Sequence, residues 1–227
     1  IPGFAGAAGT TGGLGGETLV VTNDRDFAKG VAPVSGTLRA AVEYGARRKT
    51  PTTIVFAPEM TGRTITLAAP LRPGDDTTID GGCSGVTLIA DADRALMILS
   101  GSRNVVLEGL PFRKHPYAGE NKGRADHRDF RDCITVAGSV DRLAFLHNDF
   151  EACGDGEIDI TSGVGKALPN AGGRITVAFN RFGPHDKAML LGTDGCVDAA
   201  RTPPEGCPLY AQGEQPLEPV YRVTLHG

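Results

Sequence analysis

Three carboxylates are the strongest candidates for chemistry in this chain of 227 residues. Asp155 and Asp159 lie four residues apart in an Asp-Gly-Glu-Ile-Asp segment, and Asp132 directly precedes the apolar run 133–136. On a straight strand, at roughly 3.3 Å per residue, the first two would lie about 13 Å apart, too far to share one ion. A bend at Gly156 would bring them together. Asp132 lies near the equivalent end of the preceding coil, and because parallel strands are about 4.8 Å apart, we expect the three side chains to converge. Because hard carboxylate oxygens suit Ca²⁺, the pattern predicts a calcium site, with a solvated turn as the alternative.

A basic side chain follows at Lys187, in a His-Asp-Lys segment directly before the apolar run 188–192. By itself this pattern is typical of a charged turn before a strand, and Lys187 gains a function only if it projects over the same groove as the acids. Other chemistries lack their signatures. The chain has no Gly-x-Ser-x-Gly motif and no Cys-x-x-Cys or His-x-x-x-His spacing, and no Lys-Ser/Thr pair follows the glycines of segment 12–16.

A degenerate repeat defines the elements that must position these residues. Four similar segments begin 38, 32 and 48 residues apart, at Arg103, Asp141, Gly173 and Tyr221. The first three lead to an aligned phenylalanine, and two carry an aligned asparagine; these residues are Phe112, Phe150, Phe182, Asn148 and Asn180. A constant core with variable spacing is typical of a solenoid with loops on one side, and stacked amides at a corner are expected to form a ladder. Strands that stack coil on coil are parallel, so the repeat predicts a parallel β-helix, with an ordinary β-sandwich as the alternative.

Composition and local patterns agree with an all-β chain. Glycine makes up 32 of the 227 residues, about twice its usual share, which excludes a helical bundle; 40% hydrophobic residues with a net charge of −4 exclude a disordered chain. Segment 37–46 has a helical pattern, and we expect it to cover the first coil. Short β-branched runs dominate the remaining chain, at 53–56, 64–67, 77–79, 86–89, 95–99, 105–107, 134–136, 143–146, 158–160, 175–179 and 223–225.

The cysteines and the charge restrict location and partners. No apolar run approaches the roughly 18 residues that a membrane helix needs, and an acidic chain without a basic stripe disfavours nucleic acid. Five cysteines are more than a cytosolic protein needs. We therefore expect secretion and a disulfide between Cys196 and Cys207, with five reduced thiols as the alternative. The chain begins Ile1-Pro2-Gly3, which favours a processed protein or a fragment.

In their order along the chain, several motifs resemble those of the pectate lyases in the right-handed parallel β-helix superfamily. The glycine-containing segments are weak signals alone, but the order of all the motifs is specific and spans nearly the whole sequence. The matching segments are Thr10–Gly16, Gly36–Glu43, Thr53–Phe56, Thr77–Gly81, Asp155–Ile160, Phe179–Phe182 and His185–Gly192. The resemblance implies one all-β domain over residues 1–227, a right-handed parallel β-helix with an N-terminal capping helix and loop insertions on one side.

The same resemblance implies an activity and roles for particular residues. Asp132, Asp155 and Asp159 match the family's calcium ligands, and Lys187 matches a lysine that contacts a substrate carboxylate. Enzymes of this family cleave polygalacturonate by β-elimination, in which the C5 proton is removed while Ca²⁺ bridges carboxylates of protein and substrate. We therefore expect a secreted, monomeric, calcium-dependent lyase that binds pectin and neither nucleic acid nor membrane.

Two departures from the family pattern put parts of this expectation in question. The family's proton acceptor is an arginine that follows a Val-Thr-Leu-His-His-Asn segment, whereas here residues 223–226 (Val-Thr-Leu-His) are followed by Gly227 alone. No residue occupies that position, so we expect no catalytic base in the chain, a β-helix truncated at its C-terminal end, and little turnover. The family's Trp-Ile-Asp-His segment reads Ala-Phe-Leu-His at residues 144–147, which changes local packing or groove shape.

Three other functions agree with parts of the sequence. A non-catalytic β-helix protein that binds acidic glycans would keep the calcium ligands and lack the arginine. A calcium-free pectin lyase fits less well, because the three aspartates would then have no partner. A polygalacturonase on the same fold would need positioned acid and base carboxylates, and the Gly-His-Gly and Arg-Ile-Lys signatures of that family are missing from the sequence.

Overall fold

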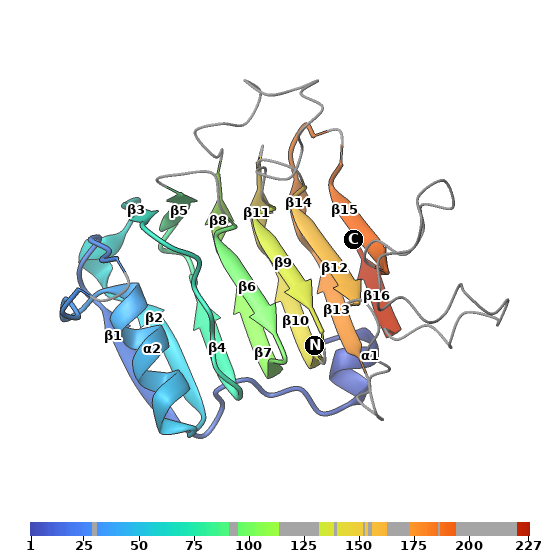
Figure 1. The fold of residues 1–227 in the computed structure, drawn as a ribbon, viewed down its shortest axis with the longest axis horizontal. Helices are drawn as coiled ribbons and strands as arrows, with labels where there is room; N and C mark the ends of the chain where they lie inside the picture. The colour runs from blue at the N-terminus through green and yellow to red at the C-terminus, as the bar shows by residue number, and fades with distance from the viewer. Residues whose placement is uncertain are drawn as a thin grey trace, which may run out of the picture.

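The chain winds into a parallel β-helix in this computed structural model, with three sheets that run side by side along one axis (Figure 1). The structure describes residues 1–28, 31–90, 95–113, 132–138, 140–151, 153, 156–162, 173–185, 187–193 and 222–227. Within these residues every strand pairing is parallel. The prediction of an all-β parallel β-helix is therefore confirmed.

The three sheets contain seven, five and four strands. The first sheet is formed, in order, by β1 (Glu17–Val21), β2 (Thr52–Phe56), β4 (Thr77–Asp80), β7 (Arg103–Glu108), β10 (Asp141–Leu146), β13 (Arg174–Ala178) and β16 (Arg222–His226). The second is formed by β3 (Thr64–Leu67), β5 (Thr87–Ala90), β8 (Pro111–Phe112), β11 (Asp149–Phe150) and β14 (Arg181–Phe182). The third is formed by β6 (Met97–Ser100), β9 (Ile134–Ala137), β12 (Ile158–Ser162) and β15 (Met189–Thr193).

The agreement with the sequence patterns is close for long strands and poor for short ones. Each predicted β-branched run overlaps one strand of the structure. The two-residue strands β8, β11 and β14 and the first strand, β1, were not predicted. The longest stretches outside the described residues are 114–131, 163–172 and 194–221, and each leads into or out of a strand of the third sheet. Cys196 and Cys207 lie in the last of these stretches, so their predicted disulfide stays a prediction.

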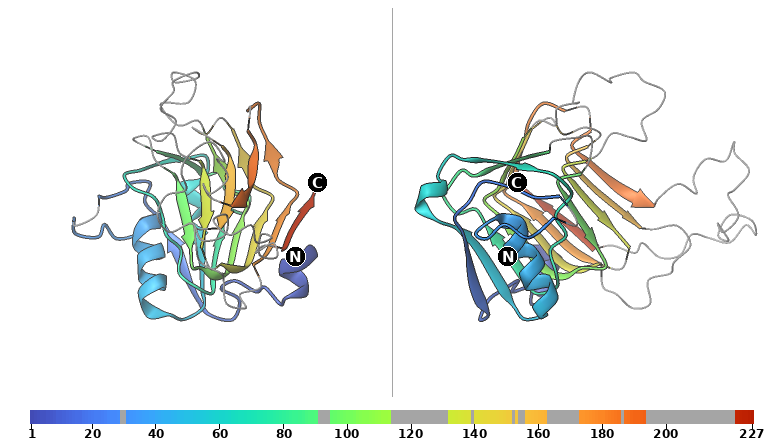
Figure 2. Two further views of the ribbon diagram at one scale, coloured as in Figure 1. Left: turned by 45° about the vertical axis from the view of Figure 1, so that its right-hand side comes forward. Right: turned by 60° about the vertical axis from the view of Figure 1, so that its left-hand side comes forward.

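Helix α2 (Leu38–Arg48) packs against β1 and β2 at the first-coil end of the stack (Figures 1 and 2). The Thr37 hydroxyl accepts a hydrogen bond from a backbone N–H of the first turn, and Leu38 and Val42 are buried in the core. The helix predicted over 37–46 is confirmed, and it continues two residues further. Neither this helix nor any other within the described ranges is long and apolar enough to cross a bilayer.

Columns of apolar side chains fill the solenoid. One column in the first sheet runs through successive register partners, each at most 3% exposed: Ile54, Ile79, Leu107, Phe145 and Val177. In the second sheet the rings of Phe112, Phe150 and Phe182 stack with centroids 4.9 and 5.4 Å apart. Burial of each such side chain stabilises the fold by about 1.5–3 kcal/mol, so the aligned phenylalanines of the repeat are core positions.

The aligned asparagines form a ladder at the corner between the first and second sheets. Asn148 Oδ1 accepts the backbone N–H of Leu110 at 3.0 Å, and Asn148 Nδ2 donates to the carbonyl of Leu107 at 2.9 Å. Asn180 repeats this pattern one coil later, with bonds of 2.8 and 2.9 Å to the backbone of Asn148 and Phe145. The predicted ladder is present, but each amide binds the backbone of the preceding coil and not the neighbouring amide. At the corner the backbone leaves the strand, so some of its N–H and C=O groups have no partner in a neighbouring strand. The asparagine side chains supply the missing hydrogen bonds.

The first sixteen residues cross the outer face of the first sheet, and we call them the N-terminal strap (Figure 1). Helix α1 (Gly3–Ala7) of the strap lies on β10, β13 and β16. Backbone N–H groups of the strap donate to side chains on four coils, from Phe4 to Thr224, Ala5 to Thr176, Thr11 to Asn104 and Gly13 to Thr78. A Cβ at Gly13 would lie 2.1 Å from the Thr52 carbonyl oxygen, so the glycine allows close approach of two backbones.

Small side chains lie beneath α1. A separate apolar cluster on the outer face consists of Ala5, Val106, Ala144, Leu146 and Ala178. Ala144 is fully buried there, at the position where the family pattern has a tryptophan. An indole at residue 144 would occupy the space that the strap fills, which gives a packing reason for this departure.

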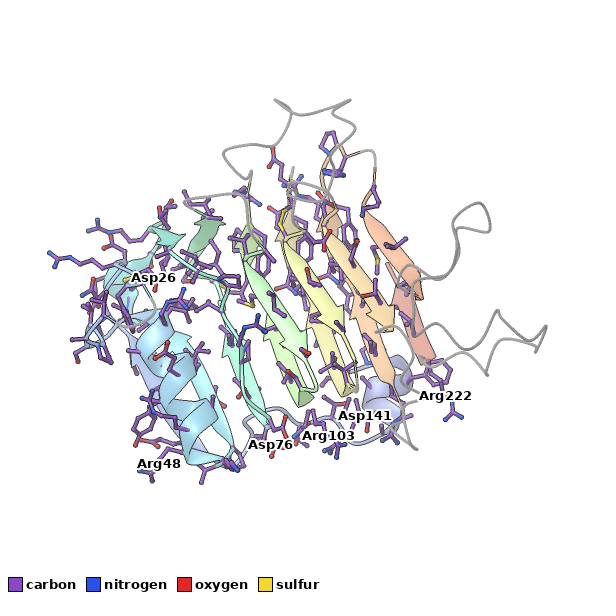
Figure 3. All side chains as sticks on the ribbon, viewed as in Figure 1. Asp26, Arg48, Asp76, Arg103, Asp141 and Arg222 are labelled. Atoms are coloured by element: carbon purple, nitrogen blue, oxygen red, sulfur yellow. A yellow bond between two sulfur atoms is a disulfide. The ribbon has the colours of Figure 1, made fainter. Side chains whose placement is uncertain are left out.

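Charged residues line the edge at which the strands of the first sheet begin, where Figure 3 labels Asp76, Arg103, Asp141 and Arg222. Arg174 Nε donates to Asp141 Oδ1 at 2.9 Å, and the Arg174 backbone N–H donates to the same oxygen at 3.2 Å. The side-chain hydrogen bond from Arg174 is the main cause that holds the pKa of Asp141 below its usual value of 3.8, against the opposing effect of burial.

Candidate active-site cluster on the third sheet

Strand register places Asp132, Gly156 and Lys187 at equivalent positions on three successive coils. Each lies two residues before one of three strand residues that pair with one another, Ile134, Ile158 and Met189. Adjacent strands in a sheet are about 4.8 Å apart, so the three positions follow one another across the sheet at that spacing. The register confirms that Asp132 lies at the equivalent end of the preceding coil, as the sequence predicted. The equivalence of Lys187 emerges only from the register, because the connections between coils differ in length.

Asp159 completes the cluster from within β12. Its neighbours Ile158 and Ile160 are buried in the core, so the alternation of the strand directs Asp159 to the outer face. Lys187 Nζ donates to Asp159 Oδ2 at 2.9 Å and lies 4.0 Å from Asp132 Oδ1. Thr135, the register partner of Asp159, donates its hydroxyl to Asp132 Oδ2 at 2.8 Å. The structure thus brings together Asp132, Asp159 and Lys187.

Gly156 makes room for this convergence. A Cβ at this position would lie 2.6 Å from Lys187 Cε, 2.7 Å from Asp159 Oδ1 and 3.3 Å from Asp132 Oδ1. Gly156 does not have a positive φ, and it precedes the strand that begins at Ile158. The bend predicted at this glycine involves Asp155, which lies outside the described residues, so it stays a prediction. What the structure shows is the space that the missing side chain leaves.

The cluster is acidic and mostly shielded from water. Asp132 and Asp159 are 8% and 5% exposed, and the Lys187 side chain is 27% exposed. Asp159 Oδ1 is buried and accepts no hydrogen bond from any residue that the structure describes. A buried carboxylate oxygen in this state costs free energy unless a cation or a donor compensates it. The two carboxylates offer hard oxygen atoms of the kind that calcium prefers.

Asp155, the third predicted ligand, lies outside the described residues. Among the residues that are described, no three His, Cys, Asp or Glu side chains gather closely enough to hold a metal ion. The described part of the cluster therefore supplies two of the three predicted carboxylates and the predicted lysine.

A disulfide and a histidine connect the coils behind the cluster. Cys133, next to Asp132, is bonded to Cys153, and both are buried. His185 Nε2 lies 2.7 Å from the Cys153 carbonyl oxygen, and His185 Nδ1 accepts the Lys187 backbone N–H at 2.9 Å. Sequence reasoning missed this disulfide, because cysteines 20 residues apart become neighbours only when coils stack. It also missed Thr135 and His185, whose partners become apparent only in three dimensions.

The chain resembles known proteins over most of its length. No protein-family model matches it. It is 33% identical over 201 residues to Pectate lyase 1 of Hesperocyparis arizonica, a match that covers 83% of this chain and 48% of that protein. Over this part of its length the chain is similar to the pectate lyases. A second pectate lyase, Putative pectate lyase 17 of Arabidopsis thaliana, is 33% identical over 190 residues, covering 81% of this chain and 43% of that protein. The chain spans about half the length of the curated pectate lyases it matches.

A solved structure supports the fold. The crystal structure of Jun a 1, the major allergen from cedar pollen, matches with a TM-score of 0.55 and 23% identity, covering 83% of this chain and 58% of that one. At this identity the likeness supports the shared parallel β-helix alone.

Proposed function

We propose that this chain forms the calcium- and polygalacturonate-binding part of a secreted, monomeric pectate lyase that acts by β-elimination. The observation that carries the proposal is the convergence of Asp132, Asp159 and Lys187 around the space at Gly156. The pectate lyase relatives support the enzyme class. The buried Cys133–Cys153 disulfide supports secretion, because such bonds persist in oxidising compartments.

The residues present fit a calcium ion. Asp132, Asp155 and Asp159 would hold it. The buried oxygen Asp159 Oδ1 accepts no hydrogen bond from the described residues, which supports a cation at this place. When bound, the ion neutralises the uronate carboxylate and makes the neighbouring C5 proton more acidic. Thr135 fixes the orientation of the Asp132 carboxylate through its hydroxyl hydrogen bond.

Lys187 gives an acidic protein a local site for a polyanion. Its ammonium group is oriented by Asp159 at 2.9 Å, and its side chain is partly exposed, so the group can also contact a uronate carboxylate. This explains how a chain of net charge −4 binds an acidic polymer: a cation and Lys187 reverse the sign of the charge at one place. We assign the proton-accepting role to no residue among the 227, so binding is the property to test.

The test is calorimetric titration of the chain with trigalacturonate, with calcium and again with excess chelator. We expect binding that requires calcium, and at least tenfold weaker binding by Asp159→Asn, which removes a charged ligand. Asp149→Asn is the matched control, because Asp149 pairs with Arg113 and Arg181 on the second sheet. Equal binding with and without chelator would contradict the calcium role.

A second measurement addresses turnover. We expect little unsaturated, ultraviolet-absorbing product from polygalacturonate with residues 1–227 alone, because no base is assigned. Robust elimination by this chain would show that one of its own residues accepts the proton and that the proposal needs revision.

A further inference from the structure

His185 occupies the position between the candidate site and the disulfide. Its Nδ1 accepts the backbone N–H of Lys187 at 2.9 Å, so the proton of the neutral ring belongs on Nε2. Nε2 lies 2.7 Å from the Cys153 carbonyl oxygen and donates to it. One imidazole thus uses both nitrogens within the protein, and both contacts fix backbone positions.

Cys153 is itself tied to the coil of Asp132. Its disulfide partner, Cys133, directly follows Asp132, and the Cys133 backbone N–H donates to the Gly156 carbonyl at 3.1 Å. A continuous series of contacts therefore leads from Asp132 through the disulfide and His185 to Lys187. It joins the three successive coils that build the cluster, on the side where their strands begin.

We propose that His185 is a positioning residue that sets the place of the Lys187 ammonium for a uronate carboxylate. This inference rests on the proposed function and extends it. Lysine has a flexible four-carbon side chain, and the Lys187 ammonium donates a hydrogen bond to Asp159 here. Fixing the Lys187 backbone restricts where the side chain can reach, which lowers the entropy lost when the ammonium meets the substrate.

The experiment is a double-mutant cycle of His185→Ala and Lys187→Met, with calcium and trigalacturonate titrated separately. Because His185 acts through Lys187, His185→Ala should weaken trigalacturonate binding about tenfold in the wild-type background and less than about twofold in Lys187→Met. Calcium binding alone should change less than about twofold, since the two contacts described for the His185 ring are to backbone atoms of Cys153 and Lys187. His185→Gln, which keeps one donor and one acceptor, should recover part of the loss. His147→Ala, at an exposed ring stacked on Phe179, is the control for removing a histidine.

The outcomes separate this inference from the proposed function. If Lys187→Met weakens trigalacturonate binding but His185→Ala does not, the positioning role is overturned and the proposed function stands. An equal loss from His185→Ala in both backgrounds also overturns it, because His185 would then act independently of Lys187. If the wild-type chain does not bind trigalacturonate, the proposed function fails and the substrate role of His185 fails with it. Hydrogen exchange of the Lys187 amide, expected to be faster in His185→Ala, measures the backbone contact whatever the ligand result.

Discussion

Replacement of Gly156 by alanine should disable the site while leaving the fold intact. The new Cβ would lie 2.6 Å from Lys187 Cε and 2.7 Å from Asp159 Oδ1. Carbon atoms in contact prefer separations of about 3.5–4.0 Å, so Lys187 has to retreat by roughly 1 Å. Its ammonium is 2.9 Å from Asp159 Oδ2. A displacement of that size, or the matching rotation of Asp159, breaks the hydrogen bond between them.

The expected magnitude follows from the hydrogen bond that the displaced Lys187 ammonium would no longer donate to a uronate carboxylate. Hydrogen bonds to charged groups contribute about 1.5–3 kcal/mol, which corresponds to a loss of about 10- to 150-fold in affinity for trigalacturonate in the presence of calcium. Stability should change little, because the clashing atoms belong to the ends of side chains and the φ of Gly156 is not positive. Alanine also restricts the unfolded chain, which offsets small losses by about 0.4–1 kcal/mol.

Calorimetric titration measures the affinity, and thermal unfolding verifies the fold. Gly183→Ala is the matched control, because its Cβ would meet Phe150 and Glu151 at 3.1 Å, away from the carboxylates and the lysine. If Gly156→Ala binds within about twofold of the wild type while its melting curve shows a folded protein, the reasoning about the space at residue 156 is refuted.

Three further predictions concern stability. Because the pKa of Asp141 is lower in the folded state than its usual value of 3.8, the stabilisation by Arg174 is complete above that value and is lost as the pH falls through the folded pKa. Asp141→Asn should therefore be less stable at neutral pH and should lose less stability in acid than the wild type, as measured by urea unfolding at several pH values. Asn148→Ala should lower the free energy of unfolding by about 2–4 kcal/mol, because it leaves buried backbone groups of the preceding coil unsatisfied; a change below 1 kcal/mol would contradict the ladder. Reduction of Cys133–Cys153 should cost about 3 kcal/mol, appropriate to a 20-residue loop, and an unchanged melting temperature after verified reduction would argue against this pairing.

The architecture was predictable from the sequence because the same pattern of residues recurs in successive coils. Aligned phenylalanines and asparagines mark the same corner of successive coils, so the coil and its parallel stacking follow from comparing the chain with itself. β-Branched runs located the longer strands for the same reason. Strands of two residues such as β8 lack a pattern of their own, since their position depends on the neighbouring coil.

The candidate site was only partly predictable from local patterns. The carboxylates and Lys187 were found by residue type, spacing and resemblance, and the position of Asp132 on the preceding coil was predicted correctly. That Lys187 lies at the equivalent position of the next coil was not predictable, because the connections between coils differ in length. The bend predicted at Gly156 concerns Asp155, which lies outside the described residues, so it stays a prediction; the structure adds the space that this glycine leaves beside Asp159 and Lys187. The Cys133–Cys153 bond and the contacts of His185 join residues on different coils. The distance between such residues along the sequence does not show that they are neighbours in the fold.

The N-terminal strap has a consequence for how this solenoid folds and unfolds. In repeat proteins each coil interacts with its neighbours alone, so the ends fray independently and unfolding spreads step by step. Here the bond between Phe4 and Thr224 joins residues 220 apart, and further bonds connect the strap to earlier coils. The strap therefore adds contacts between residues very far apart in the sequence, and such contacts slow folding. They also mean that unfolding of the coil at one end of the solenoid removes contacts of the strap and so destabilises the other coils that the strap binds. Helix α1 therefore completes its contacts with the first sheet only after β16 has formed. We therefore expect this chain, although its coils stack in one dimension, to unfold more cooperatively than a solenoid whose coils contact only their neighbours.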